Sequence, residues 1–298
     1  MDKVYLTTRE VSQLLGVNEK KVYSLAQDGK LPGTKLTGKW IFPRGELEEH
    51  LRRDARKTIE RISAGSKQII LLCGSDDPVM YVIHGLFHRQ NPEYALFTSS
   101  VGSSEGLRLL KRGLCHIALS HLYDPGSGDY NFPFIMEIFK NPKDLTVINL
   151  FHRSIGFVSQ KEIASFREVL AGKLRFVNRQ AGSGIRNRID HLLAEEGIEG
   201  ERIAGFGEEV FTHHEVAQRI LNGRADVGVA SEFVAGYAQL SFHKLFDERF
   251  DLVVYRDTFF EKTIQVLLEF IRSDTFLKLL EDFRGYSGRL TGKVLFPE

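Results

Sequence analysis

The sequence has little that would place the protein outside the cell or in a membrane. Only two of its 298 residues are cysteines, Cys73 and Cys115, and both lie in apolar runs. Buried, reduced thiols are typical of such positions, so we expect neither a disulfide nor a reactive thiol. The longest uncharged apolar runs, such as residues 68–73, fall far short of the ~20 residues of a membrane-spanning helix. The first ten residues contain no apolar segment of a signal peptide, and we expect a cytoplasmic protein.

Motifs that mark a metal site, a nucleotide site or a catalytic centre are also missing. The sequence has no His-Glu-x-x-His or Cys-x-x-Cys pair, and the consecutive residues 213–215 (His-His-Glu) cannot all face one ion. The Gly-Ser-Gly step at residues 182–184 lacks the Gly-Lys-Ser/Thr ending of a Walker loop. Asp124, Asp129 and Asp226 have no neighbour that completes a nucleophilic arrangement. We therefore expect no cofactor, no metal and no enzymatic activity.

The composition is that of a folded protein with two or three domains. Hydrophobic residues make up 42% and charged residues 27% of the chain, whose 298 residues exceed the ~100 to 200 of one domain. The net charge of +1 is unevenly distributed. Residues 1–65 hold 13 Lys and Arg against 9 Asp and Glu, whereas residues 66–298 hold 27 against 30. A small basic domain joined to a larger acidic one favours nucleic-acid binding by the first.

The first 53 residues show short helices separated by turn signals. Thr7 and Glu10 have the spacing of a capping box, which predicts that a helix starts there. Asn18 is expected to cap a second helix after a tight turn, so the two helices form a helix-turn-helix pattern. Residues 34–42 follow as two predicted strands around a Thr-Gly turn, and this hairpin forms a wing before a last short helix.

Six segments of this region share the pattern of a known family: residues 6–11 (Leu-Thr-Thr-Arg-Glu-Val), 15–17, 22–23, 28–32, 39–42 (Lys-Trp-Ile-Phe) and 46–48. They resemble the winged helix-turn-helix modules of the excisionase and MerR-like type. In that family the second helix enters the major groove and the wing touches the backbone of DNA. The resemblance implies DNA contacts by Asn18, Lys20, Lys21, Tyr23, Ser24, Lys35 and Lys39. The alternative is that these lysines form a solvated surface on a module that binds another protein.

Residues 54–66 are strongly charged and end in Ser-Ala-Gly-Ser, which predicts a short connecting helix followed by a linker. Ala55, Ile59 and Ile62 have helical spacing, which would let this segment pack against a second copy of itself.

From residue 67 onward, predicted strands alternate with predicted helices, which is typical of an α/β domain with a parallel sheet. Two strand-rich crossings, residues 145–158 and 242–255, predict two lobes with a cleft between them. We assign about 67–150 and 256–298 to lobe 1 and about 157–245 to lobe 2.

Three turns in this region join a strand to a helix through glycine and serine: residues 73–77, 101–105 and 179–186. Each turn places free backbone N–H groups at a helix N-terminus, where they favour an anion. Plain N-capping explains any one turn taken alone. Three such turns can nevertheless converge on one ligand.

Five segments of this region share the pattern of a second family: residues 74–78, 102–107, 116–122, 178–186 and 212–228. They resemble the substrate-binding domain of the periplasmic type II fold, in the branch that is fused behind helix-turn-helix modules and is akin to molybdate- and tungstate-binding proteins. The resemblance implies a ligand between the lobes, contacted by Ser75, Ser103, Ser104, His121, Ser183, Arg186 and Asp226. The family's first motif has His where this chain has Asp76, and a carboxylate there would repel a bare oxyanion.

The sequence therefore predicts an α/β protein with a winged helix-turn-helix domain (residues 1–53), a linker (54–66) and a two-lobed domain of the periplasmic-binding-protein type II fold (67–298). We expect a one-component transcriptional regulator that senses a small oxyanion such as molybdate or tungstate and binds double-stranded DNA as a homodimer or a higher oligomer. The alternatives are a ligand-binding protein whose helix-turn-helix docks a protein, a sensor of a small organic anion, and a transferase-like enzyme built on the α/β lobes.

Overall fold

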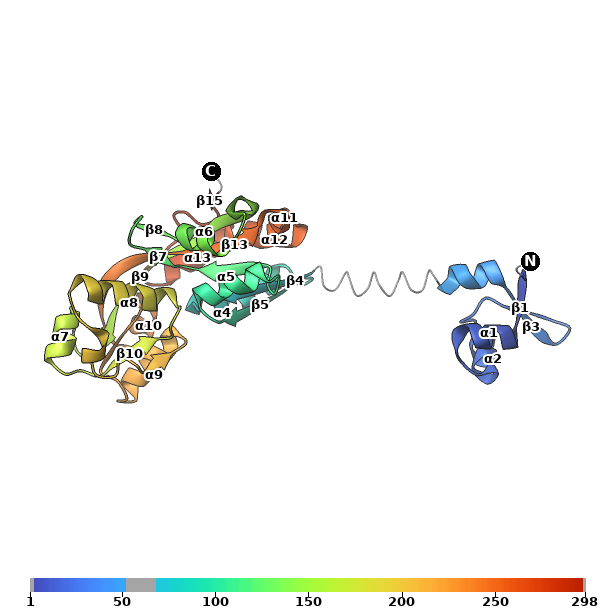
Figure 1. Ribbon diagram of the computed structural model, residues 1–298, viewed down its shortest axis with the longest axis horizontal. Helices are drawn as coiled ribbons and strands as arrows, with labels where there is room; N and C mark the ends of the chain where they lie inside the picture. The colour runs from blue at the N-terminus through green and yellow to red at the C-terminus, as the bar shows by residue number, and fades with distance from the viewer. Residues whose placement is uncertain (1–2, 52–67, 297–298) are drawn as a thin grey trace. The chain divides into compact units, whose positions relative to one another are not determined.

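Figure 1 shows the computed structural model of the chain, which describes residues 3–51 and 68–296. The chain divides into two compact units, Met1–Lys67 and Gln68–Glu298. The predicted connecting helix and linker, with Ala55, Ile59 and Ile62, lie outside the described residues. In the described part of the chain, no helix is long and apolar enough to cross a membrane.

The first unit has the predicted helices and wing. It comprises β1 (Tyr5–Thr7), α1 (Thr8–Leu15), α2 (Glu19–Gln27), β2 (Thr34–Leu36) and β3 (Lys39–Pro43), and residues 44–51 are helical. The predicted capping box is formed, since the hydroxyl of Thr7 accepts from the N–H of Glu10 at 3.4 Å and the Glu10 carboxylate accepts from the N–H of Thr7 at 2.8 Å. The short strand β1 was not expected, and it pairs with β3 to complete the three-stranded sheet β1-β3-β2.

The core of the first unit is small and consists of side chains from its helices, from β3 and from the loop after α2. Its buried members are Val11, Val22, Ala26, Leu31, Phe42 and Leu47. Trp40 is partly buried, stacks on Phe42 with ring centroids 6.3 Å apart and packs against this core. Trp40 therefore contributes to the core and lies on the inner side of the wing strand.

The second unit is built on a ten-stranded sheet with the order β11-β10-β12-β9-β13-β6-β4-β5, in which β14 and β15 also pair with β9. The strands of this sheet are β4 (Ile69–Gly74), β5 (Ala95–Ser100), β6 (Ile117–Ser120), β9 (Leu145–Ser159), β10 (Phe176–Arg179), β11 (Glu209–Val210), β12 (Val227–Ser231), β13 (Ser241–Tyr255), β14 (Tyr286–Ser287) and β15 (Val294–Phe296). A separate hairpin is formed by β7 (Tyr123–Asp124) and β8 (Asp129–Tyr130).

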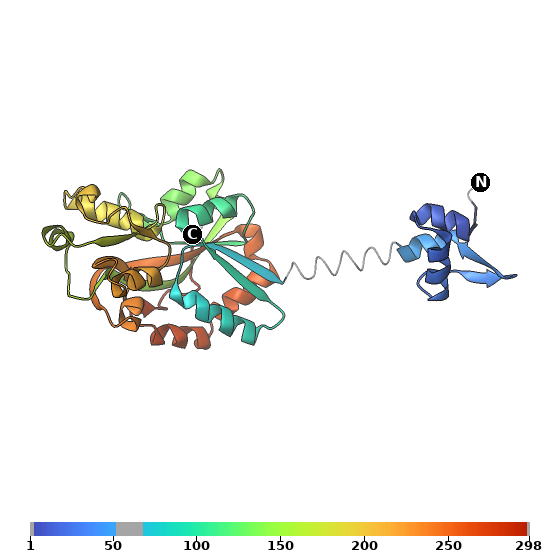
Figure 2. The ribbon, with the colours of Figure 1, turned by 90° about the horizontal axis from the view of Figure 1, so that it is seen from below.

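Helices alternate with these strands, as predicted, and lie on both sides of the sheet (Figures 1 and 2). The longer ones are α4 (Pro78–Gln90), α5 (Ser103–Lys111), α6 (Phe132–Ile138), α8 (Gly184–Glu195), α9 (His213–Leu221), α12 (Lys262–Ile271) and α13 (Asp274–Asp282). Shorter helices are α7 (Phe166–Ala171), α10 (Glu232–Tyr237) and α11 (Arg256–Phe259). Helix α4 has the bounds that the sequence predicted, because Asp77 accepts from the N–H of Val79 and Pro78 occupies the first helical position.

The two strand-rich crossings are β9 and β13, which pair antiparallel from Ser159 with Ser241 to Leu145 with Tyr255. They run through the whole second unit, as Figure 1 shows, and they join two groups of core residues. Two hydrophobic clusters have their buried residues within 70–151 and 250–283. Two others lie within 155–246. We call the first group lobe 1 and the second lobe 2.

Candidate functional site between the lobes

Three residues predicted from the sequence meet where neighbouring parallel strands of lobe 1 end. Ser75 follows β4, Ser103 opens α5 after β5, and His121 follows β6. The Ser75 hydroxyl lies 2.9 Å from the Ser103 hydroxyl and 2.5 Å from Nε2 of His121. All three side chains are buried. The carboxyl ends of parallel strands share one edge of a sheet, which explains why residues distant in the sequence converge here.

Lobe 2 contacts this group through the start of α8. Ser183 caps α8 by accepting from the N–H of Arg186 at 3.1 Å. The next residue, Gly184, lies so close to His121 that a Cβ on it would be 2.3 Å from Nδ1 of the imidazole. The N–H of Ser104 donates to the carbonyl of Gly182 at 3.4 Å. The lobes are therefore closed on each other at the predicted site.

A carboxylate on the central ribbon extends this group. Glu248 on β13 accepts from Nδ1 of His121 at 2.6 Å and from Nε of Arg153 at 2.7 Å. Arg153 is the direct cross-strand partner of Glu248 on β9. It also pairs with Asp77, which accepts from the hydroxyl of Tyr286 at 2.8 Å. Hydroxyl, imidazole and carboxylate thus form one buried hydrogen-bonded chain at the junction of the lobes.

Burial and charge set the protonation of this chain. Burial opposes ionisation of Glu248, but His121 and Arg153 outweigh it and lower the pKa of this carboxyl. Burial lowers the pKa of His121 despite the neighbouring Glu248, so the imidazole is neutral at pH 7. Burial raises the pKa of Asp77 to about 6, with Arg153 acting in the opposite direction. At pH 7 the chain therefore contains a neutral imidazole next to an ionised carboxylate.

Lobe 2 presents polar atoms that have no partner. Arg179, at the end of β10, is 3% exposed, and its Nη2 donates to the carbonyl of Phe211 at 2.6 Å. Its Nε and Nη1 have no hydrogen-bond partner among the described residues. Burial lowers the pKa of Arg179 to about 10, so the guanidinium remains charged at pH 7. Leaving buried donors of a cation unpaired costs a few kcal/mol, which a bound anion would offset.

His213, at the start of α9, adds a further unpaired donor. The N–H of Ser231 donates to Nδ1 of His213 at 3.1 Å, so in the neutral ring Nε2 carries the proton. Burial, with Arg153 and Arg179 nearby, lowers the pKa of His213 well below 6.5 and keeps the ring neutral. Neither Nε2 of His213 nor the hydroxyl of Ser231 has a partner in the part of the chain that the structure describes.

Sequence reasoning missed the ionisable residues of this site, namely Asp77, Arg153, Arg179, His213 and Glu248. The available signal was a charge inside an apolar strand, since Arg153 interrupts the buried run of β9 and Arg179 ends the run of β10. A charged residue in a strand buried on both faces is rarely tolerated without a partner or a ligand.

The structure does not bring the side chain of Arg186 to this group. Its guanidinium pairs with Asp190 at 2.9 Å and with Glu209 at 2.9 Å, and it lies over the ring of Phe206. Only its backbone N–H, through the hydroxyl of Ser183, takes part in the start of α8. The sequence analysis predicted that Arg186 binds the ligand, but neighbouring carboxylates already neutralise its charge.

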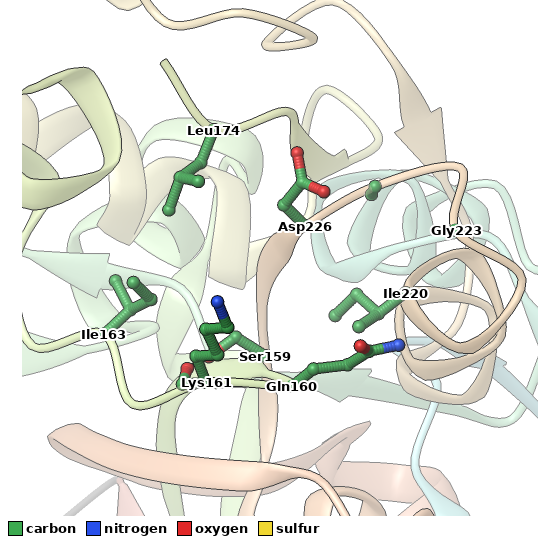
Figure 3. Close-up of a pocket in the computed structure, with 9 residues that line it drawn as sticks. Ser159, Gln160, Lys161, Ile163, Leu174, Ile220, Gly223 and Asp226 are labelled. Carbon is green, nitrogen blue, oxygen red and sulfur yellow. The ribbon is translucent and has the colours of Figure 1, made fainter. Parts of the chain in front are cut away.

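Asp226 also lies elsewhere. It comes just before β12, whereas the interlobe residues follow the carboxyl ends of their strands. Its carboxylate pairs with Arg175 at 2.9 Å, and it lines a separate pocket of about 260 Å³. Figure 3 shows this pocket, with Ser159, Lys161 and Leu174 also on its walls. Asp226 therefore belongs to a different surface from Ser75 and His121.

The predicted DNA-binding residues of the first unit are on its surface. Lys20, Lys21, Tyr23 and Ser24 are exposed on α2, whose other face buries the core residues Val22 and Ala26; Lys35 and Lys39 are exposed on the wing. The side chain of Asn18 accepts from the N–H of Lys21 at 2.8 Å, so this residue caps the helix.

No group of three or more His, Cys, Asp or Glu residues within 3–51 and 68–296 is placed to hold a metal ion. Cys73 and Cys115 are buried and unbridged, as expected.

Comparison with known proteins gives two domain matches and several relatives. Residues 84–272 match the PBP superfamily domain, and residues 5–55 match a helix-turn-helix domain. The chain is 26% identical over 304 residues to the uncharacterized protein YvgK of Bacillus subtilis (strain 168), with 97% of each chain covered.

Among solved structures, the chain is similar to one from Clostridium perfringens that is described as a phosphate ABC transporter substrate-binding protein with bound phosphate. The TM-score is 0.57 at 14% identity, covering 72% of this chain and 97% of that one. It is also similar to the tungstate ABC transporter from Geobacter sulfurreducens, with a TM-score of 0.54 at 12% identity, covering 73% and 99%. At this identity both likenesses establish the fold and no more.

Proposed function

Because this chain belongs to the PBP superfamily and has a helix-turn-helix domain ahead of its PBP domain, we propose that it is a one-component DNA-binding regulator that senses a small anion. The observation that carries the proposal is the set of buried, unpaired donors on Arg179 and His213 between the lobes. A cation whose donors face no partner inside a protein is a ready anion site. Molybdate and tungstate are the oxyanions that the sequence suggested, and phosphate is the one bound in a solved structure of similar fold.

In this proposal, closure of the lobes is the switch. An anion that is held by both lobes favours the closed form by its difference in affinity for the closed and open forms. The β9–β13 ribbon connects the lobes. Closure would change the conformation of this ribbon and, through it, the arrangement of the two subunits of a homodimer. The distance between the two DNA-binding domains would then change. The protein senses its ligand without converting it.

The DNA-binding role predicts a loss of affinity in Lys21→Ala. Lys21 lies on the helix that is expected to enter the major groove, so removal of its positive charge from the DNA interface is expected to weaken binding several-fold and to lower the salt slope of log affinity by up to about 1. Measurement of DNA affinity across a salt series tests this, with Lys143→Ala in the second unit as the control for a lost positive charge. An unchanged slope in Lys21→Ala would argue that α2 docks another protein instead.

The sensing role is tested by thermal unfolding of the full chain with molybdate, tungstate, sulfate, phosphate and small carboxylates. A ligand at 100 times its Kd stabilises the native state by about 2.7 kcal/mol, which raises the melting temperature by several degrees. The same anion should then change DNA affinity. If no anion alters either quantity, the proposed sensing function is wrong.

One observation favours a second function. Ser75, His121 and Glu248 have the order of hydroxyl, imidazole and carboxylate that activates a serine nucleophile for acyl transfer. Against this, Ser75 is only 2% exposed in the closed form. A fluorophosphonate probe that labels the wild-type protein but not Ser75→Ala would establish the nucleophile, and hydrolysis of p-nitrophenyl acetate would report turnover. The regulator proposal predicts neither.

A further inference from the structure

The hydrogen bonds of lobe 1 can be assigned proton by proton. The ionised carboxylate of Glu248 can only accept, so Nδ1 of His121 donates to it and Nε2 of the neutral ring carries a lone pair. The hydroxyl of Ser75, 2.5 Å from Nε2, therefore donates its proton to His121. The only remaining direction for the 2.9 Å contact between the two serines is donation from Ser103 to Ser75.

This chain of donation uses both serine protons. The oxygen of Ser103 also accepts from the backbone N–H of His121 at 3.3 Å, which closes the chain into a ring. Each hydroxyl has one proton to give, and neither proton is free for a ligand. Ser75 and Ser103 can therefore offer only lone pairs.

Asp76 adds a further acceptor on the same lobe. Its side chain is 5% exposed, and its carboxylate lies 3.4 Å from the backbone nitrogen of His213 in lobe 2. It is also the charge that most strongly opposes the effect of burial on the pKa of Arg179. At the junction of the lobes, lobe 1 therefore presents hydrogen-bond acceptors, namely hydroxyl lone pairs and a carboxylate.

Lobe 2 has the opposite character. Its unpaired atoms include Nε and Nη1 of Arg179, which can only donate, and Nε2 of His213, which carries the proton in the neutral ring. Oε1 of Gln180 is an unpaired acceptor on the same lobe, and Nε and Nη1 of Arg188 are further unpaired donors. The hydroxyl of Ser231 is unpaired as well, and it can donate or accept. One lobe therefore mainly accepts hydrogen bonds and the other mainly donates them.

The charged groups at the junction of the lobes support the same conclusion. Two buried guanidinium groups, those of Arg153 and Arg179, lie among three buried carboxyl groups, those of Asp76, Asp77 and Glu248. Arg153 pairs with Asp77 and Glu248, and its Nη2, although it makes no hydrogen bond, lies 2.7 Å from the Glu248 carboxylate. Among the described residues of this group, the unpaired donors of Arg179 are therefore the cationic ones without a carboxylate in ion-pair contact. A bare dianion would gain this cation, but it would also meet the Asp76 carboxylate and two hydroxyl oxygens that have no proton to donate.

We propose that the sensed ligand is a small anion that carries its own O–H or N–H donors. Its negative oxygens bind Arg179 and His213 of lobe 2, and its donors bind Ser75 and Asp76 of lobe 1. Hydrogen phosphate and an α-hydroxy acid both have this chemistry, whereas sulfate, molybdate and tungstate carry no proton at neutral pH. The inference rests on the proposed sensing function and narrows its ligand.

Matched pairs of ligands test this inference on the full chain. Isothermal titration at pH 7 would compare phosphate with sulfate, and lactate with propionate, which differ mainly in the presence of a donor. We expect the donor-bearing member of at least one pair to bind about tenfold more tightly, the change that one hydrogen bond makes. If sulfate, molybdate or tungstate binds as tightly as the donor-bearing anions, the inference is wrong but the sensing function stands. If no anion binds, the sensing function itself fails.

Two variants should change the preference of the protein for phosphate over sulfate. In Glu248→Gln the side-chain amide can donate to Nδ1 of His121, which moves the ring proton to Nε2 and frees the proton of Ser75 for a ligand. Asp76→Asn replaces an acceptor with a group that donates, and it leaves the central ribbon intact if Glu248→Gln does not fold. Each folded variant is expected to gain about tenfold in sulfate affinity relative to phosphate.

Asp226→Asn is the control, because it makes the same change of carboxylate to amide on a residue that pairs with Arg175. Its preference between phosphate and sulfate should equal that of the wild type. An unchanged preference in the folded variants at positions 76 and 248 would contradict the assignment of the protons.

Discussion

Arg179→Gln is expected to lower anion affinity about 100-fold or more. The two free nitrogens of Arg179 are unpaired cationic donors with no described carboxylate in ion-pair contact, whereas the unbonded Nη2 of Arg153 lies 2.7 Å from Glu248. Each charge-assisted hydrogen bond contributes about 1.5 to 3 kcal/mol. Loss of both is enough to remove measurable binding of a ligand of micromolar affinity. Isothermal titration of the full chain with phosphate, and with any other anion that raises the melting temperature, measures the effect.

The matched control is Arg186→Gln. Arg186 lies on α8, seven residues further along the chain, but Asp190 and Glu209 already occupy its guanidinium. We expect its anion affinity to stay within about twofold of the wild type, since no charge free for a ligand is lost. The sequence had assigned the ligand to Arg186, so this pair of variants compares the two assignments directly. An intact affinity in Arg179→Gln together with a loss in Arg186→Gln would restore the assignment from sequence.

The unfolding of Arg179→Gln without ligand provides a second measurement. Arg179 is a buried cation with two unpaired nitrogens, and its charge is costly until an anion arrives. Replacement by the neutral glutamine is therefore expected to leave the ligand-free protein at least as stable as the wild type. A large fall in stability without ligand would show that Arg179 acts in the fold and not in binding.

Gly184→Ala is expected to prevent closure of the lobes. A Cβ at this position would lie 2.3 Å from Nδ1 of His121, 2.5 Å from its Cε1 and 2.7 Å from its carbonyl oxygen. The carbonyl belongs to the backbone after β6, and the imidazole is held by Ser75 and Glu248, so neither can move aside at low cost. We expect a loss of anion affinity of about 100-fold, since an anion bound by one lobe alone keeps only part of its contacts.

This variant should leave each lobe folded, because Gly184 has no positive φ and alanine is well suited to the start of a helix. The Gly85→Ala variant in α4 is the control, since nothing lies within 4 Å of a Cβ there. It is expected to bind anions normally and to gain up to ~1 kcal/mol in stability. Titration with phosphate and small-angle scattering with and without phosphate test both variants. Wild-type affinity in Gly184→Ala would mean that closure at this point is not needed for binding.

Much of the fold followed from the sequence because its signals are local. The capping box of Thr7 and Glu10, the cap of Asn18 and the start of α4 at Pro78 all join groups within three residues of each other. Such contacts are encoded by short spacing and need no information from distant parts of the chain. The short strand β1 was missed because its pairing with β3 is a contact between residues more than thirty positions apart.

The recurring turns were enough to indicate that Ser75 and Ser103 lie close together, whereas His121 was named from the family resemblance. Each follows a strand of the parallel part of the sheet, and such strands place their carboxyl ends at one edge. When the same strand-to-helix turn recurs along the chain, the residues of these turns are therefore expected to lie close together in the fold.

Only the tertiary structure decided how the site is charged. Glu248 faces Arg153 because two strands of fifteen residues pair in one register, and a shift by one residue would point the side chains to opposite faces. Arg186 pairs with Asp190 on its own helix and with Glu209 on β11, whereas Arg179 has donors without a partner. The contact of Arg186 with Glu209 depends on how distant segments pack. Register and the approach of the two lobes are properties of contacts between distant segments, and no short stretch of sequence specifies them.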